Sequence, residues 1–556
     1  MSLLNTNIND NTSKEGWKIL KSPINKILFI IICILILLII LINPILNIVA
    51  KPKILNSLKS RKNLNVNAGY AGYNVFTQNF SIDNIRISMK DSASGDSADF
   101  YIPYFQMSNL KLLKLIVGSG LSFNEMIFNH PHLFVKRTFK NNKKELKKNE
   151  NKDPDNSAFL NILPERLKPL TFRQISINFL TLSQIINDKE YNDSVKKILI
   201  TAEDVKIDSS VIQDSLSLKY ASGLNILIED LSYHFKDDYL IKLGNLKASS
   251  SDSTFILKDI TYKPYISDSA FFSHRKYSSD RYKIRAPFIS LKGINFKKLI
   301  WRNSYLFRYI DARDLNISIC TNKEAPPDTN SIPKMPNEIM RSAKKKISIK
   351  DVRLKNWTIH IRARHPYVKK YSDVTFTKVN GEIKNVSNTP KEQSEKNPCK
   401  LDISGSLYGL AKLSIKMNLP LLSQNLSFDY KGELNSMSAL PINNQIKPAD
   451  HVKLKSGEIE SINFSVHVLR SAADVYVKPI YKNLKIEKLK ENSEEGGVAN
   501  KAGSFIANNF VIRTSNPNKD GEIKIGSIIY LKDKGDTFLD VIWTSVKKGL
   551  GEVVGF

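Results

Sequence analysis

The histidines of this chain are its first candidates for chemistry. His130 and His132 flank a proline, and alternating histidines can bind a metal ion, but no cysteine or acidic residue stands close enough in sequence to complete a ligand set. His360 and His365 are five residues apart on a predicted strand and its exit, which is a poor spacing for joint ligation. We predict no metal site from either pair.

The sequence also lacks the motifs of nucleotide-dependent and nucleophilic enzymes. It contains no G-x-x-x-x-G-K-[ST] phosphate loop and no G-x-S-x-G elbow, and Gly118-Ser119-Gly120 predicts a turn. The acidic residues are scattered, so no pair can be singled out as general acid and base. We therefore predict a protein that is not an enzyme and needs no cofactor. An envelope enzyme would require a polar cluster that the fold brings together.

Positive charge is the strongest signal in the composition. The 83 lysines and arginines exceed the 54 aspartates and glutamates, which gives a formal net charge of +29. Lys140–Lys148 and Lys344–Lys346 could contact phosphates, but no recognisable binding module surrounds them, so we predict no nucleic-acid partner. The positive charge then lies either on a solvated exterior or at the ends of the protein that contact a membrane. There, each basic residue near anionic head groups contributes about 1 kcal/mol to membrane binding.

Length, composition and cysteine content limit the classes of protein to which the chain can belong. The 556 residues, 42% of them hydrophobic, are enough for about two to four domains or one repetitive body. The chain has three cysteines, Cys33, Cys320 and Cys399, which excludes a disulfide-rich scaffold. Cys33 lies in an apolar run, and the sequence leaves open whether Cys320 and Cys399 form a disulfide.

Residues 27–50 form a run of 24 residues without a charge. A hydrocarbon core needs about 20 helical residues, so the run predicts one transmembrane anchor in a single-pass protein. A cleaved signal peptide, the alternative, would have a shorter apolar stretch that ends in small residues. Four lysines precede the run and five basic residues follow it, so charge alone leaves the orientation open. Representative anchor residues are Ile27, Leu28, Phe29, Ile40 and Leu41.

Beyond about residue 75 the chain alternates apolar and polar residues with a period of two. The clearest examples lie in 357–362, 413–419, 426–431 and 462–468. Such alternation predicts strands with one apolar and one wetted face, and it favours antiparallel meanders over a parallel sheet that is buried on both faces. Segments rich in charge, proline and glycine separate the strands and predict exposed loops. They are 143–157, 321–336, 388–398 and 491–503.

Two stretches of the chain resemble each other at a nearly fixed offset. Residues 103–116 lie over 287–300 without a gap, and a second piece, 175–182, matches 352–359. Each copy reads as a strand, a short turn or helix carrying Lys-Leu-Ile, more strands, a polar loop, and strands again. Repeated strand-rich units stack into elongated bodies, because each needs a neighbour to cover its apolar face. Chance similarity of two apolar strand patterns is the alternative.

The last segment has the pattern of an amphipathic helix. Asp536 or Thr537 can cap a helix that runs from about Phe538 to Gly549. The apolar stripe, with two lysines beside it, predicts docking onto the parent sheet, and a membrane-surface role is the alternative. The stripe consists of Leu539, Ile542, Trp543, Val546 and Leu550.

Few helices are available to cover the apolar face of the predicted sheet, so the sheet must curl or pack on another sheet. A closed sandwich would fill its interior with side chains. An open, curled sheet would keep an apolar trough that can hold acyl chains, at about 0.8 kcal/mol per buried CH₂. The sequence does not separate these outcomes. Candidate lining residues, each of which could equally be plain core, are Leu413, Ile415, Met417, Ile462, Phe464, Val466, Val468, Trp357, Ile359 and Ile361.

The apolar segment and the repeated units carry a family resemblance. In each copy a proline-led strand runs into Lys-Leu-Leu or Lys-Lys-Leu-Ile, and an Ile-x-hydrophobic-x-x-hydrophobic-x-hydrophobic pattern, with valine first in the second copy, follows. From about residue 27 to 550 the chain resembles the AsmA-like bacterial envelope proteins, relatives of the TamB and YhdP group. The tail from Asn516 through Trp543 resembles the end of AsmA-like proteins from Bacteroidetes-type bacteria. The chain is shorter than the largest members.

The resemblance implies a β-groove anchored in the inner (plasma) membrane, with the C-terminal body in the periplasm. It implies phospholipid as the ligand, a role in lipid transport or outer-membrane homeostasis, and room for another envelope protein as a partner at the distal end. The alternative function is a structural or assembly protein of the cell envelope, whose closed β domains bind another envelope protein.

The expected fold class is mainly β. We expect one N-terminal transmembrane helix, an elongated, curled antiparallel β-sheet groove built of repeated units, and a short C-terminal amphipathic helix. The expected divisions are an N-terminal tail (1–26), the anchor (27–50), a first groove unit (51–142), a polar linker (143–165), a second groove region (166–320), a second linker (321–345), a C-terminal groove region (346–535), and the C-terminal helix and tail (536–556).

Overall fold

The computed structural model divides the chain into two compact units. Unit 1 comprises residues 1–192 and 204–213, and unit 2 comprises residues 193–203 and 214–556. The residues that the structure describes are 23–59, 64–90, 96–137, 170–186, 189–207, 223–235, 238–301, 304–330, 332–366, 371–489 and 512–555.

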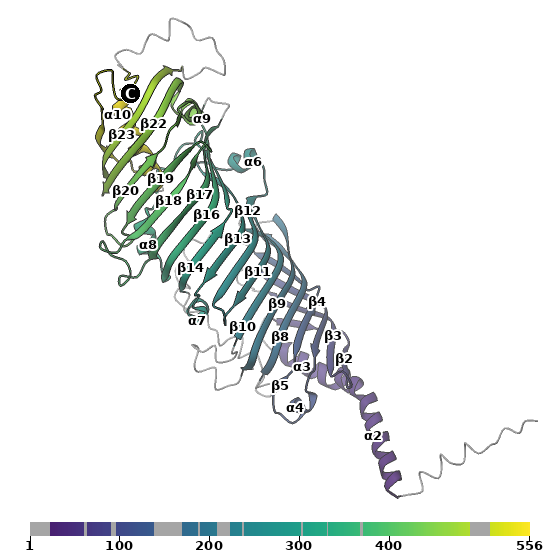
Figure 1. Ribbon diagram of the computed structural model, residues 1–556. Helices are drawn as coiled ribbons and strands as arrows, with labels where there is room; N and C mark the ends of the chain where they lie inside the picture. The colour runs from purple at the N-terminus through teal and green to yellow at the C-terminus, as the bar shows by residue number, and fades with distance from the viewer. Residues whose placement is uncertain are drawn as a thin grey trace, which may run out of the picture. The chain divides into compact units, whose positions relative to one another are not determined.

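The described strands belong to one mixed, mostly antiparallel sheet of 24 strands, drawn as arrows in Figure 1. This confirms the mainly β fold that the alternating patterns predict. The division between the units falls within β9 (Lys189–Ile207), inside the region 166–320 that the sequence suggested as one piece.

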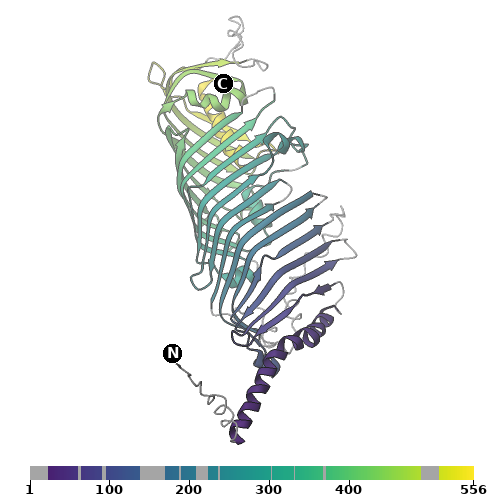
Figure 2. The same ribbon diagram turned by 90° about the vertical axis from the view of Figure 1, so that its right-hand side faces the viewer.

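Unit 1 begins with helices and continues as strands around a small core. Helix α2 (Pro23–Ile45) passes through a π-helical turn, Leu46–Ala50, into α3 (Lys51–Lys59), as Figure 2 shows. The core is formed by Tyr73, Leu110, Phe123 and Leu170. The other elements are β1 (Leu64–Asn67), β2 (Ala71–Asn74), β3 (Asn79–Lys90), β4 (Ser97–Ser108), α4 (Leu112–Ile116), β5 (Leu121–Ser122), β6 (Glu125–Asn129), β7 (His132–Arg137) and β8 (Leu170–Ile186).

Two asparagines hold the C-terminal end of α2 and the turn after it against strand β2. Asn43 Oδ1 accepts the Tyr73 N–H at 2.7 Å. Asn47 accepts the Ala71 N–H at 2.9 Å and donates its amide to the Ala71 carbonyl at 2.6 Å. These side chains satisfy backbone groups of β2 that would otherwise need another strand or water. The last turns of the segment 27–50 are therefore attached to unit 1.

The predicted anchor coincides with α2 and the π-helical turn. The side chains of 23–30, 33, 35 and 38 lie outside the described residues, and Ile27, Leu28 and Phe29 are among them. Ile40 is 63% exposed, and Leu41 is exposed beside it. In the part of the chain that the structure describes, no helix is both long and apolar enough to cross a membrane.

The two stretches that match in sequence have the same order of elements. In unit 1, β4 leads into α4 and then into β5, β6 and β7, which pair in parallel with β8. In unit 2 a strand, a short helix and two strands again precede a strand that pairs with them in parallel. These elements are β13 (Asp280–Lys292), α7 (Phe296–Trp301), β14 (Tyr305–Arg313), β15 (Asn316–Asn322) and β16 (Ile347–Arg364).

The parallel pairs correct the expectation of a wholly antiparallel sheet. A parallel pair needs a crossover connection of about a dozen or more residues. The polar segments 143–157 and 321–336 belong to those connections, and the first of them lies outside the described residues. The second connection also contains a helix that the sequence did not indicate, α8 (Pro336–Ser342). Its buried Asn337 donates to the Ser423 carbonyl at 3.0 Å.

The other pairings of unit 2 between described strands are antiparallel. Its remaining elements are β10 (Gly223–Phe235), β11 (Tyr239–Ser249), β12 (Thr254–Pro264), α6 (Asp268–Ser273), β17 (Ser372–Ser387), β18 (Cys399–Leu407), β19 (Ala411–Leu419), β20 (Ser427–Leu434), β21 (Met437–Ser438), a 3₁₀ turn (Leu440–Ile442), α9 (Asn443–Asp450), β22 (Val452–Leu469), β23 (Ala472–Lys488), β24 (Gly526–Leu531) and α10 (Phe538–Val554).

Helix α10 packs on the sheet at the C-terminal end of unit 2. Thr537 caps it, as predicted, and forms a capping box with Asp540. Val541 and Val553 are fully buried in a core that the helix shares with β18 to β24. The Tyr430 hydroxyl donates to the Ile542 carbonyl at 2.9 Å, and burial raises the pKa of Tyr430 to about 12. The predicted docking of this helix on its parent sheet is confirmed.

The buried side of α10 agrees only in part with the predicted apolar stripe, of which Ile542, Val546 and Leu550 pack against the core. Leu539 is 59% exposed and Trp543 is 45% exposed. A Cβ atom on Gly549 would lie 2.6 Å from Val477 Cγ2, so the helix approaches the sheet too closely for large side chains at this point. The fully buried residues of the helix are accordingly Val541, Ser545, Gly549 and Val553.

Candidate functional site

Two rows of apolar residues cross unit 2 from strand to strand. Residues directly opposite each other in a ladder project from the same face, so the register defines each row. Both rows pass through fourteen strands, and the hydroxyl of Tyr430 is the one polar side-chain group in them. We call the side of the sheet that carries these rows the apolar face. The first row is Ile198, Ile228, Leu246, Leu257, Ile289, Ala312, Leu354, Gly381, Ile403, Ile415, Gly432, Phe464, Val477 and Gly526. The second row is Ile200, Ile226, Ala248, Phe255, Leu291, Ile310, Val352, Ile383, Leu401, Met417, Tyr430, Val466, Val475 and Ile528.

The C-terminal part of the apolar face is covered by the protein itself. Strands β18 to β24 share one core with α10, and most of the lining candidates from the sequence lie there. The buried candidates are Met417, Ile462, Val466 and Val468. The half-buried candidates are Leu413, Ile415 and Phe464. Except for Ile415, these residues belong to or pack against the filled core, so they do not line an open trough.

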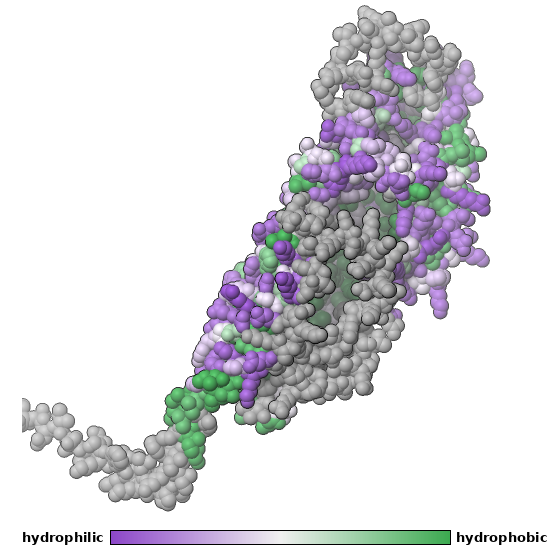
Figure 3. All heavy atoms as spheres, turned by 180° about the vertical axis from the view of Figure 1, so that it is seen from behind, coloured by the Kyte–Doolittle hydropathy of each residue, from purple (hydrophilic) through white to green (hydrophobic). Residues whose placement is uncertain are grey.

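Over β9 to β13, no helix or strand of the described residues covers this face in the same way. Its large side chains there are half-buried, and of them only Ile289 contacts a core cluster among the described residues. Figure 3 shows hydrophobic side chains, coloured green, at the floor of a hollow. We define the open apolar face as Ile198, Ile200, Ile226, Ile228, Leu246, Phe255, Leu257, Ile289 and Leu291.

An aromatic cluster closes one end of these strands. Helix α6, which connects β12 to β13, buries Phe271 and Phe272 beside Tyr239. The Tyr239 ring stacks on Tyr262 with centroids 4.4 Å apart and meets Phe271 edge to face at 5.7 Å. Such pairs add to the free energy of area burial, so this end of the hairpin is firmly packed.

The other three lining candidates from the sequence lie together on β16. Trp357, Ile359 and Ile361 are half-buried, and the register places Ile359 opposite Ile317 of β15. Trp357 Nε1–H donates to the Ala312 carbonyl at 2.8 Å, which satisfies the one polar atom of that side chain. These three residues continue the apolar face beside its open part, so they remain lining candidates.

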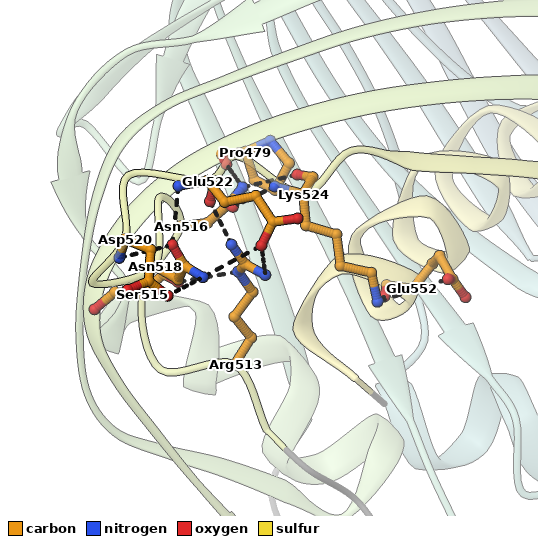
Figure 4. Close-up of polar contacts among 9 residues, drawn as sticks. All are labelled: Pro479, Arg513, Ser515, Asn516, Asn518, Asp520, Glu522, Lys524 and Glu552. Atoms are coloured by element: carbon orange, nitrogen blue, oxygen red, sulfur yellow. Dashed lines mark hydrogen bonds and ion pairs between the residues drawn. The ribbon is translucent and has the colours of Figure 1, made fainter.

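The tail motif around Asn516 is a structural cluster (Figure 4). Asn516 is fully buried, and its amide donates to the carbonyls of Pro479 and Lys524 while its Oδ1 accepts the Lys524 N–H at 2.8 Å. Asn518 Oδ1 accepts the Glu522 N–H at 2.9 Å. These bonds close the loop that leads into β24. The residues that carry the family resemblance here therefore position a strand of the sheet.

The histidines that the sequence singles out occupy separate places. His130 stacks on Phe179 with ring centroids 4.9 Å apart, and His132 Nε2 lies 3.0 Å from a serine hydroxyl on β8. His360 and His365 each form a hydrogen bond with a hydroxyl of β17. Within the described stretches, no group of three or more His, Cys, Asp or Glu side chains is placed to hold a metal ion.

Cys320 and Cys399 are both buried and free. Burial raises the pKa of the Cys399 thiol to about 12, so this thiol stays protonated at neutral pH. The pair therefore forms no disulfide in this structure. A buried, protonated thiol is also a poor nucleophile, which leaves Cys399 as a small core residue.

Comparison with known proteins assigns this chain to no family. The sequence matches no family model, and no curated protein matches it. The AsmA-like resemblance therefore stays a prediction. The functional argument then depends on the apolar face and on the charges of the opposite face.

Proposed function

We propose that this chain is a membrane-anchored, AsmA-like envelope protein that holds or transfers phospholipid acyl chains on its open apolar face and so supports outer-membrane homeostasis. The observation that carries the proposal is the pair of unbroken apolar rows, which α10 covers at one end and which stay half-exposed over β9 to β13. Contiguous apolar surface of this kind marks a binding site in a soluble domain.

The chemistry of the open apolar face favours hydrocarbon as the ligand. No hydrogen-bonding side chain interrupts either row over β9 to β13, so a ligand there needs no polar group at the point of contact. Five neighbouring strands span about 19 Å at a spacing of about 4.8 Å, which is enough to receive much of an acyl chain. Burial then contributes about 0.8 kcal/mol per CH₂.

The membrane anchor in this proposal is the uncharged segment 27–50. Exposed apolar side chains of the described part of α2, such as Ile40, support this role. The hydrogen bonds of Asn43 and Asn47 to β2 would then hold unit 1 at the point where the chain leaves the bilayer. An inner-membrane location with a periplasmic body comes from the family resemblance.

A structural or assembly protein of the envelope is the second candidate. The filled core under α10 favours it, because closed β domains of this kind usually present their outer surface to a partner. In that case another envelope protein would cover the open apolar face.

Lipid retention tests the proposal. We expect full-length protein, extracted in mild detergent and examined by native mass spectrometry, to carry phospholipid that survives exchange into a second detergent. The open apolar face would hold the acyl chains by area burial alone, so retention should depend little on salt. Protein that never carries phospholipid, even after incubation with vesicles, would favour the structural alternative.

A further inference from the structure

The opposite side of β11 to β13 carries an unusual set of charges. Side chains alternate along a strand, so the neighbours of the open-face residues Leu257 and Leu291 point to the other side. The basic residues there are all exposed. We define the basic outer face as Lys242, Lys247, Lys258, Lys263, Lys283, Arg285 and Lys292.

The register brings these charges together on adjacent strands. Lys242 of β11 and Arg285 of β13 flank Thr261 of β12 in one row, and Lys258 lies in the next row opposite Asn245. None of the seven forms an ion pair or a side-chain hydrogen bond with a described residue.

Several lysines on the same outer side further along unit 2 contact acidic side chains. Lys416 contacts Asp402 at 3.0 Å across two strands, and Lys384 contacts Glu382 at 3.0 Å. Lys482 lies 3.3 Å from Glu458 and 3.5 Å from a second glutamate. Among the described residues, no acidic side chain pairs with the seven basic residues on β11 to β13, so this cluster can receive an anion supplied from outside.

The residue types on the basic outer face indicate which kind of anion it binds. Six of its seven residues are lysines, which are mobile point charges, whereas defined phosphates and bases are usually read by arginine forks. The one aromatic residue on this side of the three strands is Phe288, and Arg313 covers its ring at 5.2 Å. Stacking of single-stranded bases is therefore disfavoured. An extended sheet surface with spread lysines suits a planar anionic surface.

We propose that the basic outer face binds the surface of an anionic phospholipid bilayer. Lysines near such a surface are attracted to its anionic head groups, and the attraction falls off within a Debye length of about 8 Å at physiological salt. This contact goes beyond the proposed acyl-chain site, because it involves the opposite side of the sheet and lipid head groups. Its failure would leave that site untouched.

Binding to anionic vesicles tests the inference. Full-length protein in phosphatidylcholine nanodiscs is passed over immobilised vesicles, either rich in phosphatidylglycerol or of pure phosphatidylcholine, with empty nanodiscs as the blank. We expect binding to the anionic vesicles that weakens strongly as the ionic strength rises to about 0.5 M. The triple variant Lys242→Gln, Lys258→Gln, Lys283→Gln should bind about tenfold more weakly or worse.

The matched control removes the same amount of charge from three lysines that contact acidic side chains. We expect Lys384→Gln, Lys416→Gln, Lys482→Gln to bind within about twofold of the unsubstituted chain, with circular dichroism confirming that both variants are folded. Equal losses in the two variants would overturn the inference. So would equal binding to both vesicle types, or tighter binding of the unsubstituted chain to duplex DNA at the same phosphate concentration.

Discussion

Replacing Val466 with aspartate is expected to unfold the C-terminal part of unit 2. Val466 is 2% exposed and lies between Tyr430 and Val475 in the core under α10. A carboxylate there would be buried in an apolar core without a charged partner, so Val466→Asp should lower the free energy of unfolding by about 4 kcal/mol or more. The measurement is thermal and urea unfolding of the full-length protein, followed by circular dichroism.

The adjacent residue provides the control for this substitution. Ser465 is exposed on the opposite side of the same strand, opposite Lys431. Ser465→Asp adds the same charge next to a lysine, so its effect on stability should stay within about 0.5 kcal/mol. A Val466→Asp variant as stable as Ser465→Asp would mean that the core under α10 is not closed.

An aspartate on the open apolar face should instead have a small effect on stability and a large effect on phospholipid retention. Leu257 is half-buried between Leu246 and Ile289 and belongs to no core cluster among the described residues. A carboxylate there can reach water, so Leu257→Asp should lower stability by no more than about 2 kcal/mol. It should reduce phospholipid retention at least about tenfold, because an acyl chain would have to desolvate the charge. Native mass spectrometry and urea unfolding measure the two effects.

Ile256 provides the control, because it lies on the same strand as Leu257 but on the opposite side of the sheet. It precedes Leu257 on β12 and projects to the other side, opposite Lys247 and Ser290. Ile256→Asp should retain lipid as the unsubstituted chain does. If Leu257→Asp unfolds the protein as severely as Val466→Asp, the face over β12 is a closed core, and the structural alternative is favoured.

The closed end of unit 2 could largely be predicted from the sequence. The strand at 462–468 alternates without interruption, and Thr537 with Asp540 makes a recognisable cap, so the strands and the helix were both expected. The predicted stripe identified three helix residues that pack against the core, but not the residues of α10 that are most buried. Which residues are most buried depends on how closely the helix approaches Val477, and a stripe of large residues does not reveal that distance.

The open part of the face was harder to predict. In β10 and β12, Asp230 and Asp259 have positive φ, and the ladders with β11 skip each of them together with Gly244, without a shift in register. The period-two pattern changes phase at each of them, so neither strand shows a long clean alternation. Seven of the ten sequence candidates accordingly came from β19 and β22, where the pattern is regular but the face is filled.

The parallel pairs illustrate a further limit. The internal match between residues 103–116 and 287–300 indicated a repeated order of elements, and the structure gives both copies a strand followed by a short helix. Nothing in that match indicates which strand the chain pairs with after a polar connection. Pairing partners far apart in sequence are fixed by tertiary packing, which local patterns do not encode.

Site-specific photocrosslinking tests the central claim most directly. Benzoylphenylalanine is introduced at Phe255, in the second apolar row, or at Ile256 on the opposite side, and full-length protein in native membranes labelled with ³²P-phospholipid is irradiated. The proposed function predicts labelled protein from position 255, at a level about tenfold or more above position 256. Equal labelling at the two positions, or no labelling at position 255, would contradict it.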